Sequence, residues 1–241
     1  MDLTGQRVVV IGGTSGIGFA VARAAMADGA EVIVASSQIS KVEAAVARLG
    51  EGAGGHAVNV KDEPDVAAFF EQIGGFHHLV FTAGDWGGRE ARGFAEVDLT
   101  RAAELASVRY WGAVAAIKHG HGSMAPNGSI VLTNGTIAHR PRKGTPLSTA
   151  MAGSIEFLTR ALAVDLAPLR VNAVCCGLIR TEVWNSIPEA GREERFQQMT
   201  ARQPLPRIGE PDEAAQAYLY LMRGGYTTGQ VLRVDGGGTL V

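Results

Sequence analysis

Three glycines with a fixed spacing carry the clearest chemical signal in the chain. The stretch VVVIGGTSGIGFAVA places Gly12, Gly16 and Gly18 directly after an apolar run and at the start of a helix-like segment. Glycine permits a tight turn and a close approach of the backbone to a ligand, and the free N–H groups at a helix start attract phosphate. We predict that this turn binds the pyrophosphate of a dinucleotide; a purely structural turn is the alternative. The residues expected to contact the phosphates are Gly12, Thr14, Ser15, Gly16, Ile17 and Gly18.

A second stretch, PLSTAMAGSIEFLTRALAVDLAP at residues 146–168, has helical spacing but no reactive group in its first turn. The residues from Ser148 to Ala152 include no acid, base or cation that titrates near neutral pH. A serine hydroxyl forms hydrogen bonds, but its pKa is far too high for it to replace a general acid. If this helix borders a catalytic site, the acid or cation must come from elsewhere.

Composition limits the classes of protein and partner. The 241 residues are 46% hydrophobic and carry a net charge of −2, with a pI near 6.3. These values suit a single domain and argue against nucleic-acid binding through bulk charge. No apolar stretch reaches the length of a membrane span, and the N-terminus does not resemble a signal peptide. The two cysteines, Cys175 and Cys176, are neighbours that frame neither a disulfide nor a zinc site, so we expect no metal and a cytoplasmic location.

Strand-like and helix-like segments alternate along the whole chain. Apolar runs typical of strands buried on both faces of a parallel sheet occur at 7–12, 31–36, 78–83, 129–134, 170–176 and 230–236, with a weaker run at 55–60. Helical spacing occurs at 18–29, 41–49, 64–73, 99–118, 148–167 and 211–222. This alternation predicts one α/β domain over residues 1–241, a doubly wound parallel sheet with helices on both faces. The strand-free segment 179–206 is expected to form a helical lid.

Several stretches across the chain resemble one family, the short-chain dehydrogenases/reductases. The glycine turn resembles the family's TGxxxGIG fingerprint, with Ile11 in place of Thr, and FTAG at 81–84 resembles its NNAG turn. RVNAVCCGLIRT resembles its RVNxVxPGxxxT segment, with Cys176 in place of Pro, and GEPDEAAQAYLYL and TGQVLRVDGGG are similar to its last helix and strand. The resemblance implies a Rossmann-type fold of about seven strands, one nicotinamide dinucleotide per subunit, and a homotetramer or homodimer.

Residue types at the end of the second predicted strand bear on the choice of cofactor. An acidic residue there would bind the 2′-hydroxyl of the adenosine ribose and repel a 2′-phosphate. This chain has Ser36 and Ser37, which can donate hydrogen bonds to a phosphate, with Lys41 nearby but no arginine. We therefore predict NADP(H) in preference to NAD(H). By resemblance, the remaining cofactor contacts are Asn59, Val60, Ala83 and Gly84, with Ile179 and Thr181 at the nicotinamide carboxamide.

The catalytic residues expected from the resemblance are missing. Most members of the family carry a serine and a Tyr-x-x-x-Lys pair, in which the tyrosine protonates the carbonyl oxygen and the lysine lowers the tyrosine pKa. The aligned positions here hold Gly135, Ser148 and Ala152, and no tyrosine occurs between Trp111 and Tyr218. The chain therefore resembles an atypical member of the classical type, without the proton relay but with most of the cofactor-binding residues.

Arg109 is the main candidate to replace the missing residues. It aligns with an asparagine of the family's active site, and its guanidinium could stabilise a developing oxyanion; a solvated surface arginine is the alternative. Thr136 and Ser148 are the candidates that carry hydroxyls. His139, in the loop cluster HRPRK, is a weaker candidate for a general acid, since such clusters are usually solvated. Two further residues are expected at the rim of the pocket, Asp85 and Trp86.

Three functions are compatible with this combination of residues. The one we expect is NAD(P)H-dependent reduction of an activated carbonyl, imine or conjugated small molecule that needs little acid assistance. The second is a sensor or partner subunit that binds the cofactor without turnover, and the third is a non-redox enzyme. The retained cofactor residues disfavour the third function but do not separate the first two. Expected partners are a small-molecule substrate and further copies of the chain, with neither nucleic acid nor membrane.

Overall fold

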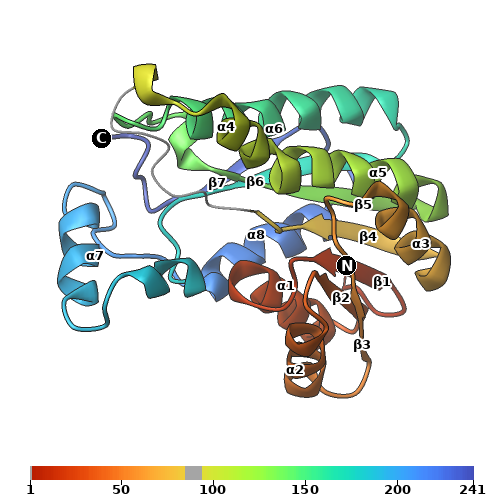
Figure 1. Ribbon diagram of the computed structural model, residues 1–241. Coiled ribbons are helices and arrows are strands. Elements are labelled where there is room, and N and C mark those ends of the chain that lie inside the picture. The colour runs from red at the N-terminus through yellow and green to blue at the C-terminus, as the bar shows by residue number, and fades with distance from the viewer. Residues whose placement is uncertain (1, 85–93) are drawn as a thin grey trace.

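A single parallel sheet organises the chain. In a computed structural model, residues 2–84 and 94–241 are described, and seven strands follow the order β3-β2-β1-β4-β5-β6-β7 (Figure 1). The order reverses between β1 and β4, which is the switch point of a doubly wound sheet. The predicted fold class is therefore confirmed. The strands are β1 Arg7–Ile11, β2 Glu31–Ser36, β3 Ala53–Ala57, β4 Phe76–Phe81, β5 Met124–Gly135, β6 Arg170–Cys176 and β7 Val231–Val234.

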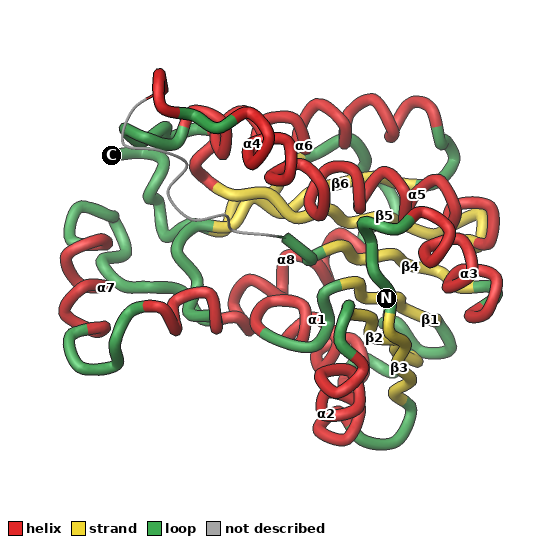
Figure 2. Tube along the Cα trace, viewed as in Figure 1, coloured by secondary structure: helices red, strands yellow, loops and turns green. Residues whose placement is uncertain are grey.

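Helices cover both faces of the sheet, as Figures 1 and 2 show. One face carries α1 Gly16–Ala27, α2 Ile39–Leu49 and α8 Pro211–Arg223. The other face carries α3 Glu63–Ile73, α4 Leu99–Ala106, α5 Ala113–Gly120 and α6 Pro146–Asp165. The short helix α7, Arg192–Thr200, lies beyond the carboxyl ends of the strands, in the segment between β6 and α8. No helix in the described ranges is long and apolar enough to cross a bilayer.

The continuous apolar runs are explained by burial on both faces of the sheet. In β1, Val8 and Val10 pack into the core beneath α1 and α8, whereas Val9 and Ile11 pack into the core beneath α3 and α5. All four side chains are at most 1% exposed. Alternate residues of a strand point to opposite faces, so a strand between two helical layers requires apolar residues at every position.

Several predicted elements differ from the structure in their bounds, among them β4 and β5, which begin before the predicted residues 78 and 129, and two further differences bear on packing. The third strand occupies residues 53–57, two residues earlier than the predicted 55–60. Its glycines allow α2 to pack closely, because a Cβ atom at Gly55 would lie 2.4 Å from Cγ1 of Val42. The helix predicted over 99–118 is divided, because a π-helical segment, Ser107–Gly112, separates α4 from α5. Extra backbone per turn in such a segment changes the direction in which its side chains project.

Helix α6 brings its first turns to the carboxyl edge of the sheet. The chain turns at Gly144, with a φ of 84°, and Pro146 opens the helix. Ala152, Ile155, Glu156 and Thr159 are buried on its inner side. Residues 148, 152 and 156 are four apart and therefore share one face of the helix.

Candidate functional site

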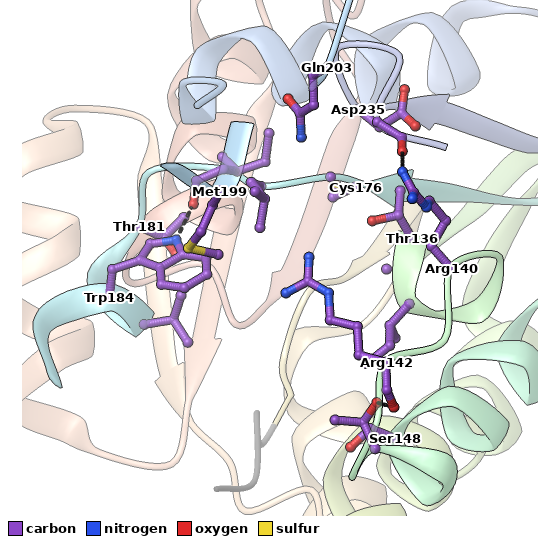
Figure 3. Close-up of a pocket in the computed structure, with 18 of the residues that line it drawn as sticks. Thr136, Arg140, Arg142, Ser148, Cys176, Thr181, Trp184, Met199, Gln203 and Asp235 are labelled. Carbon is purple, nitrogen blue, oxygen red and sulfur yellow. Dashed lines mark hydrogen bonds between the residues drawn. The ribbon is translucent and has the colours of Figure 1, made fainter. Parts of the chain in front are cut away.

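The candidate site is a cavity of about 700 Å³ at the carboxyl edge of the sheet. Its walls come from the ends of β5 and β6, the π-helical segment, the start of α6 and the region around α7. In Figure 3, Trp184 and Met199 stand on one side of the cavity, and Thr136 and Arg140 stand on the other. Such a volume is within the range of small-molecule and cofactor sites.

The glycine turn after β1 is closely packed. Gly12 has a φ of 88° and Gly16 a φ of 49°, backbone conformations that other residues rarely adopt. A Cβ atom at Gly18 would lie 2.2 Å from the carbonyl oxygen of Gly12, and one at Gly12 would lie 2.5 Å from the backbone nitrogen of Ala83. Each substitution would therefore require the backbone to move.

The same turn leaves backbone donors for an anion. Helix α1 begins at Gly16, and the Ser15 side chain before it makes no capping hydrogen bond. The first N–H groups of a helix have no acceptor inside the helix, and the helix dipole adds positive charge there. Thr14 and Ile17 flank these groups, and Ile17 also lines the cavity. The turn fits the pyrophosphate of a dinucleotide, because a close backbone and free N–H groups are what that group requires.

The other predicted cofactor residues occupy the same edge of the sheet. Ser36 ends β2, and Ser37 follows it and is exposed. Asn59 follows β3, and its side-chain oxygen accepts a hydrogen bond from the backbone nitrogen of Lys61 at 3.2 Å. Val60 is 9% exposed and packs against Gly112 in the π-helical segment. A Cβ atom on Gly112 would lie 2.8 Å from Cγ2 of Val60.

The predicted nicotinamide segment lies against the phosphate turn. Ile179 is 6% exposed, forms a β-bridge with Gly209 and lines the cavity together with Thr181. A Cβ atom at Gly16 would lie 3.0 Å from Cγ2 of Thr181. The indole nitrogen of Trp184 donates a hydrogen bond to the carbonyl oxygen of Ile179 at 2.7 Å. This edge can therefore hold a nicotinamide dinucleotide from the phosphate turn to the cavity, where the reduced form would supply a hydride.

Arg109 lies inside the site. It belongs to the π-helical segment, is 9% exposed and lines the cavity. Its guanidinium lies against the backbone of Gly84, because a Cβ atom there would lie 2.6 Å from Nη2 of Arg109. The alternative of a solvated surface arginine is therefore wrong. Gly84 and Ala83 end the described part of the turn after β4, and the predicted rim residues Asp85 and Trp86 lie outside the described residues.

The remaining catalytic candidates face the same cavity as Arg109. Thr136 and Gly135 line it at the end of β5, and Ser148 and Met151 line it from the first two turns of α6. Ala152, at the position of the family lysine, is fully buried. The structure thus brings Arg109, Thr136 and Ser148 to one cavity.

Cys176 is the one described thiol that lines this cavity. Burial raises the pKa of the Cys176 thiol to about 11, although the hydrogen bond with Tyr218 and the charge of Arg109 lower it. At neutral pH the thiol is therefore protonated and is a poor nucleophile, because the thiolate is the reactive form.

His139 is held away from the cavity, in a polar group that the sequence did not reveal. Nε2 of His139 lies 2.6 Å from Oε1 of Glu156, and Nδ2 of Asn134 donates to the same oxygen at 2.7 Å. Nη2 of Arg233 lies 3.2 Å from Nδ1 of His139. Because a guanidinium only donates, Nδ1 accepts and Nε2–H donates to the carboxylate. The sequence feature that could have indicated this polar group is Glu156, an acidic residue four positions after Ala152 on the same face of α6.

A metal-like grouping also lies here, among the described residues. Ligand atoms of His139, Glu156 and Cys175 lie within 4.8 Å of one another. Burial and the nearby charge of Glu156 raise the pKa of the Cys175 thiol to about 12. A metal ion would have to displace that proton and the hydrogen bond between His139 and Glu156, so the grouping is explained by packing and hydrogen bonding.

Comparisons with known proteins agree with this architecture. A family described as "Enoyl-(Acyl carrier protein) reductase" matches residues 11–239. The short-chain dehydrogenase/reductase fsr5 of Gibberella fujikuroi is 34% identical, over 98% of this chain and 95% of its own length. The MalC reductase/Diels-Alderase of Malbranchea aurantiaca superposes with a TM-score of 0.91 at 31% identity, covering 99% of this chain and 98% of its own.

A third similar protein bears on the site. It is a short-chain oxidoreductase from Pseudomonas aeruginosa PAO1, whose NADPH-bound structure is described as containing an atypical catalytic centre. The two structures superpose with a TM-score of 0.89 at 27% identity, over 98% of this chain and 97% of the other. Family match, close relatives and fold all agree with the resemblance read from the motifs. The chain belongs to the short-chain dehydrogenase/reductase family of nicotinamide-dependent oxidoreductases.

Proposed function

We propose that the protein is an NADPH-dependent reductase of activated carbonyl, imine or conjugated small molecules, working without the family's tyrosine and lysine. The observation that carries this proposal is the position of Arg109, which is buried in a π-helical segment and lines the cavity beside Ser148 and Thr136. π-Helical segments are frequent at functional sites, and this one directs the Arg109 side chain to the cavity.

Arg109 supplies the electrostatic part of the reaction. As a hydride adds to an activated carbonyl, negative charge develops on its oxygen, and a preoriented guanidinium stabilises that charge. The Thr136 and Ser148 hydroxyls donate hydrogen bonds that orient the same oxygen. The proton comes from water, because none of these three side chains releases one near neutral pH. This limits the reaction to substrates that need little acid assistance.

The preference for NADP(H) rests on the end of β2. Ser36 and Ser37 offer hydroxyl donors without a carboxylate, and Lys41 lies one turn into α2. A 2′-phosphate gains donors at this position and meets no like charge, whereas a ribose 2′-hydroxyl finds no acidic acceptor. The similar oxidoreductase from P. aeruginosa was described with NADPH bound, which supports the same choice.

The remaining features of the proposal concern the surroundings of the site. Residues 179–206 form a lid, which places Trp184 and Met199 against the cavity. The exposed Phe157 and Val164 of α6 favour a homotetramer or homodimer through this helix. Two buried, unpaired cysteines suit the reducing cytoplasm.

The first experiment titrates the protein with NADPH and NADH and then measures NADPH oxidation with a panel of enones, imines and ketones. We expect tighter binding of NADPH and oxidation with at least one activated substrate. Arg109→Ala should lower kcat/KM by about 100- to 1,000-fold, the usual cost of losing one oxyanion donor, with NADPH affinity nearly unchanged. Arg109→Lys should recover part of the rate because it keeps the charge.

Other results assign a different function. NADPH binding without oxidation of any substrate would favour a sensor or partner subunit. Absence of binding for both cofactors would exclude the reductase and the sensor together. Unchanged turnover in Arg109→Ala would remove Arg109 from the mechanism.

A further inference from the structure

Arginines dominate the charge of the cavity wall. Arg109, Arg140, Arg142 and Arg202 all line it. Among the described lining residues, Asp235 carries the side-chain carboxylate, so arginines outnumber acidic side chains four to one. The whole chain carries a net charge of −2, so this excess is local to the cavity and does not follow from composition.

The carboxylate of Asp235 is already occupied. Its Oδ2 accepts hydrogen bonds from the backbone nitrogen and the hydroxyl of Thr239 at 2.9 and 2.8 Å, and its Oδ1 accepts one from the backbone nitrogen of Gly237 at 3.0 Å. Asp235 therefore fixes the loop after β7. It does not neutralise the cavity arginines by direct contact, since it forms no ion pair with a described residue.

The outer arginines come from two sides of the cavity. Arg140 and Arg142 lie in the loop that leads into α6, and Arg202 lies just after α7. Nη1 of Arg140 donates to the carbonyl oxygen of Gly238 at 2.7 Å, which holds this side chain at the wall. Figure 3 shows Arg142 extending toward the middle of the cavity. Within the described ranges, neither Arg142 nor Arg202 forms an ion pair.

These arginines are too far along the sheet to serve the adenosine end of the cofactor. The 2′-phosphate position is at the end of β2, whereas Arg140 and Arg142 follow β5, and the sheet order places β1 and β4 between them. Three strand spacings correspond to about 14 Å. The charge therefore faces the substrate end of the cavity.

The rest of the lining combines apolar side chains with polar ones such as Ser186 and Gln198. The apolar side chains include Leu105, Met151, Trp184, Ile187 and Met199. A lining that combines apolar side chains with four arginines is suited to an amphiphilic ligand, whose apolar body removes water and whose anionic group meets the guanidinium groups.

We infer that the substrate of the proposed reductase carries a carboxylate on an apolar body, that Arg142 and Arg202 bind this carboxylate, and that cationic iminium substrates are excluded. This inference rests on the proposed function and narrows its substrate class. Arginine suits the task because its planar donors match a carboxylate, and it keeps its charge at every physiological pH. A positive iminium carbon would meet the four guanidinium groups of the same cavity and be repelled by them.

The experiment measures binding without requiring turnover. The protein saturated with NADP⁺ is titrated with 4-(trifluoromethyl)benzoate and with its neutral analogue 4-(trifluoromethyl)benzamide, and binding is followed by ¹⁹F NMR. We expect the benzoate to bind at least about tenfold more tightly than the benzamide, as for a charge-assisted hydrogen bond. Arg142→Gln and Arg202→Gln should each reduce this preference by about three- to tenfold, because the sites are partly screened by water.

A matched control uses the neighbouring residue. Lys143→Gln removes the same charge from the same loop, but Lys143 does not line the cavity, so the preference should be retained. Equal affinities for benzoate and benzamide in the wild type, or an equal loss of preference in Lys143→Gln, would overturn the inference. A fall in NADPH affinity in Arg142→Gln without a change in the preference would also overturn it, because the arginines would then bind cofactor phosphates.

Turnover separates this inference from the proposed function. NADPH oxidation is compared for 4-(3-oxobut-1-enyl)benzoate and its methyl ester, two enones that differ in charge. A lower KM for the acid in the wild type, lost in Arg142→Gln with kcat nearly unchanged, supports the inference. Oxidation of both enones with equal KM overturns the inference and leaves the reductase intact. Absence of any oxidation together with a strong benzoate preference counts against the reductase while the anion site remains.

Discussion

The glycine turn at residues 12–18, the predicted phosphate site, and the first turn of α6 border the same cavity but depend on their residues in different ways. In the turn, backbone N–H groups would bind the ligand, and the residue types are dictated by space: Gly12 and Gly16 have positive φ, and Gly18 has no room for a Cβ atom. In α6, Ser148 and Ala152 occupy an ordinary helix, whose backbone accepts almost any side chain.

This difference explains why one half of the site keeps the family pattern and the other half does not. Replacing a glycine of the turn disturbs the fold and the ligand site together. Replacing Tyr and Lys by Ser148 and Ala152 removes a proton relay while the helix stays in place. A cavity can therefore change its chemistry on the α6 side without losing its cofactor-binding side.

The first test breaks the constrained region, the glycine turn, where stability and cofactor affinity should fall together. Gly18→Ala places a Cβ atom 2.2 Å from the carbonyl oxygen of Gly12 and 2.4 Å from Oγ1 of Thr82. We expect the free energy of unfolding to fall by about 1–3 kcal/mol, as for overpacked sites. A similar cost within the ligand site corresponds to about 10- to 100-fold in NADPH affinity. Urea denaturation and NADPH fluorescence titration measure the two effects.

The matched control lies in α6, the region that tolerates substitution. Gly153 is inside α6, and a Cβ atom there would meet nothing within 4 Å. Gly153→Ala should raise the free energy of unfolding by about 0.5–1 kcal/mol, because alanine is the better helix former, and should leave NADPH affinity unchanged. If both substitutions proved equally harmless, the contrast between the two regions would be lost.

The same contrast determines how much could be predicted from the sequence. The sheet, its two helical layers and the tight glycine turn after β1 were predictable, because apolar periodicity and glycine spacing are local consequences of burial and backbone geometry. The third strand was misplaced by two residues, since at the edge of the sheet glycines that admit α2, such as Gly55, replace the apolar residues that identify inner strands.

The site beyond the phosphate turn was only partly predictable. Arg109 was identified by alignment, but its burial depends on the π-helical segment, which has no clear local pattern. The contact between His139 and Glu156 joins a loop to the middle of α6, and neither residue indicates the other in the sequence. The arginine cluster likewise forms only when the loop before α6 and the end of α7 meet at one cavity.

The tolerance of α6 can be tested by restoring the tyrosine and lysine that most family members carry at positions 148 and 152. Ser148→Tyr combined with Ala152→Lys restores the family pair on one face of α6. We expect the rate with simple ketones to rise by about 100-fold, because a positioned general acid contributes that much. Arg109 lines the same cavity and adds positive charge that lowers the tyrosine pKa. NADPH oxidation with a ketone panel measures the gain.

Ser148→Tyr alone controls for the buried lysine. Ala152 is fully buried, so an ammonium group there carries a desolvation cost and could weaken folding. Ser148→Tyr introduces the phenol without that cost, and with Arg109 nearby it should retain a part of the gain. If neither variant reduced ketones faster than the wild type, α6 would accept the two side chains without restoring activity. The cavity would then be shaped for another substrate.

The smallest expected effect is the pH dependence of turnover, and it separates the two ways of supplying a proton. The described ionisable side chains in the cavity are arginines, Cys176 and Asp235. Burial works to raise the pKa of Asp235, but hydrogen bonds from Thr239 and Gly237 hold it below its usual value, and the pKa of Cys176 is raised to about 11.

Between pH 6 and 9 the raised pKa keeps Cys176 protonated and the lowered pKa keeps Asp235 ionised, and guanidinium groups in proteins do not lose their proton in this range. We therefore expect kcat/KM of the wild type to vary by less than about twofold over this range. A phenol–ammonium pair would instead add groups whose ionisation affects the rate. The plot of kcat/KM against pH for Ser148→Tyr/Ala152→Lys should therefore change slope within this range. A break in the wild-type profile within this range would contradict this view, because no described ionisable side chain of the cavity accounts for one.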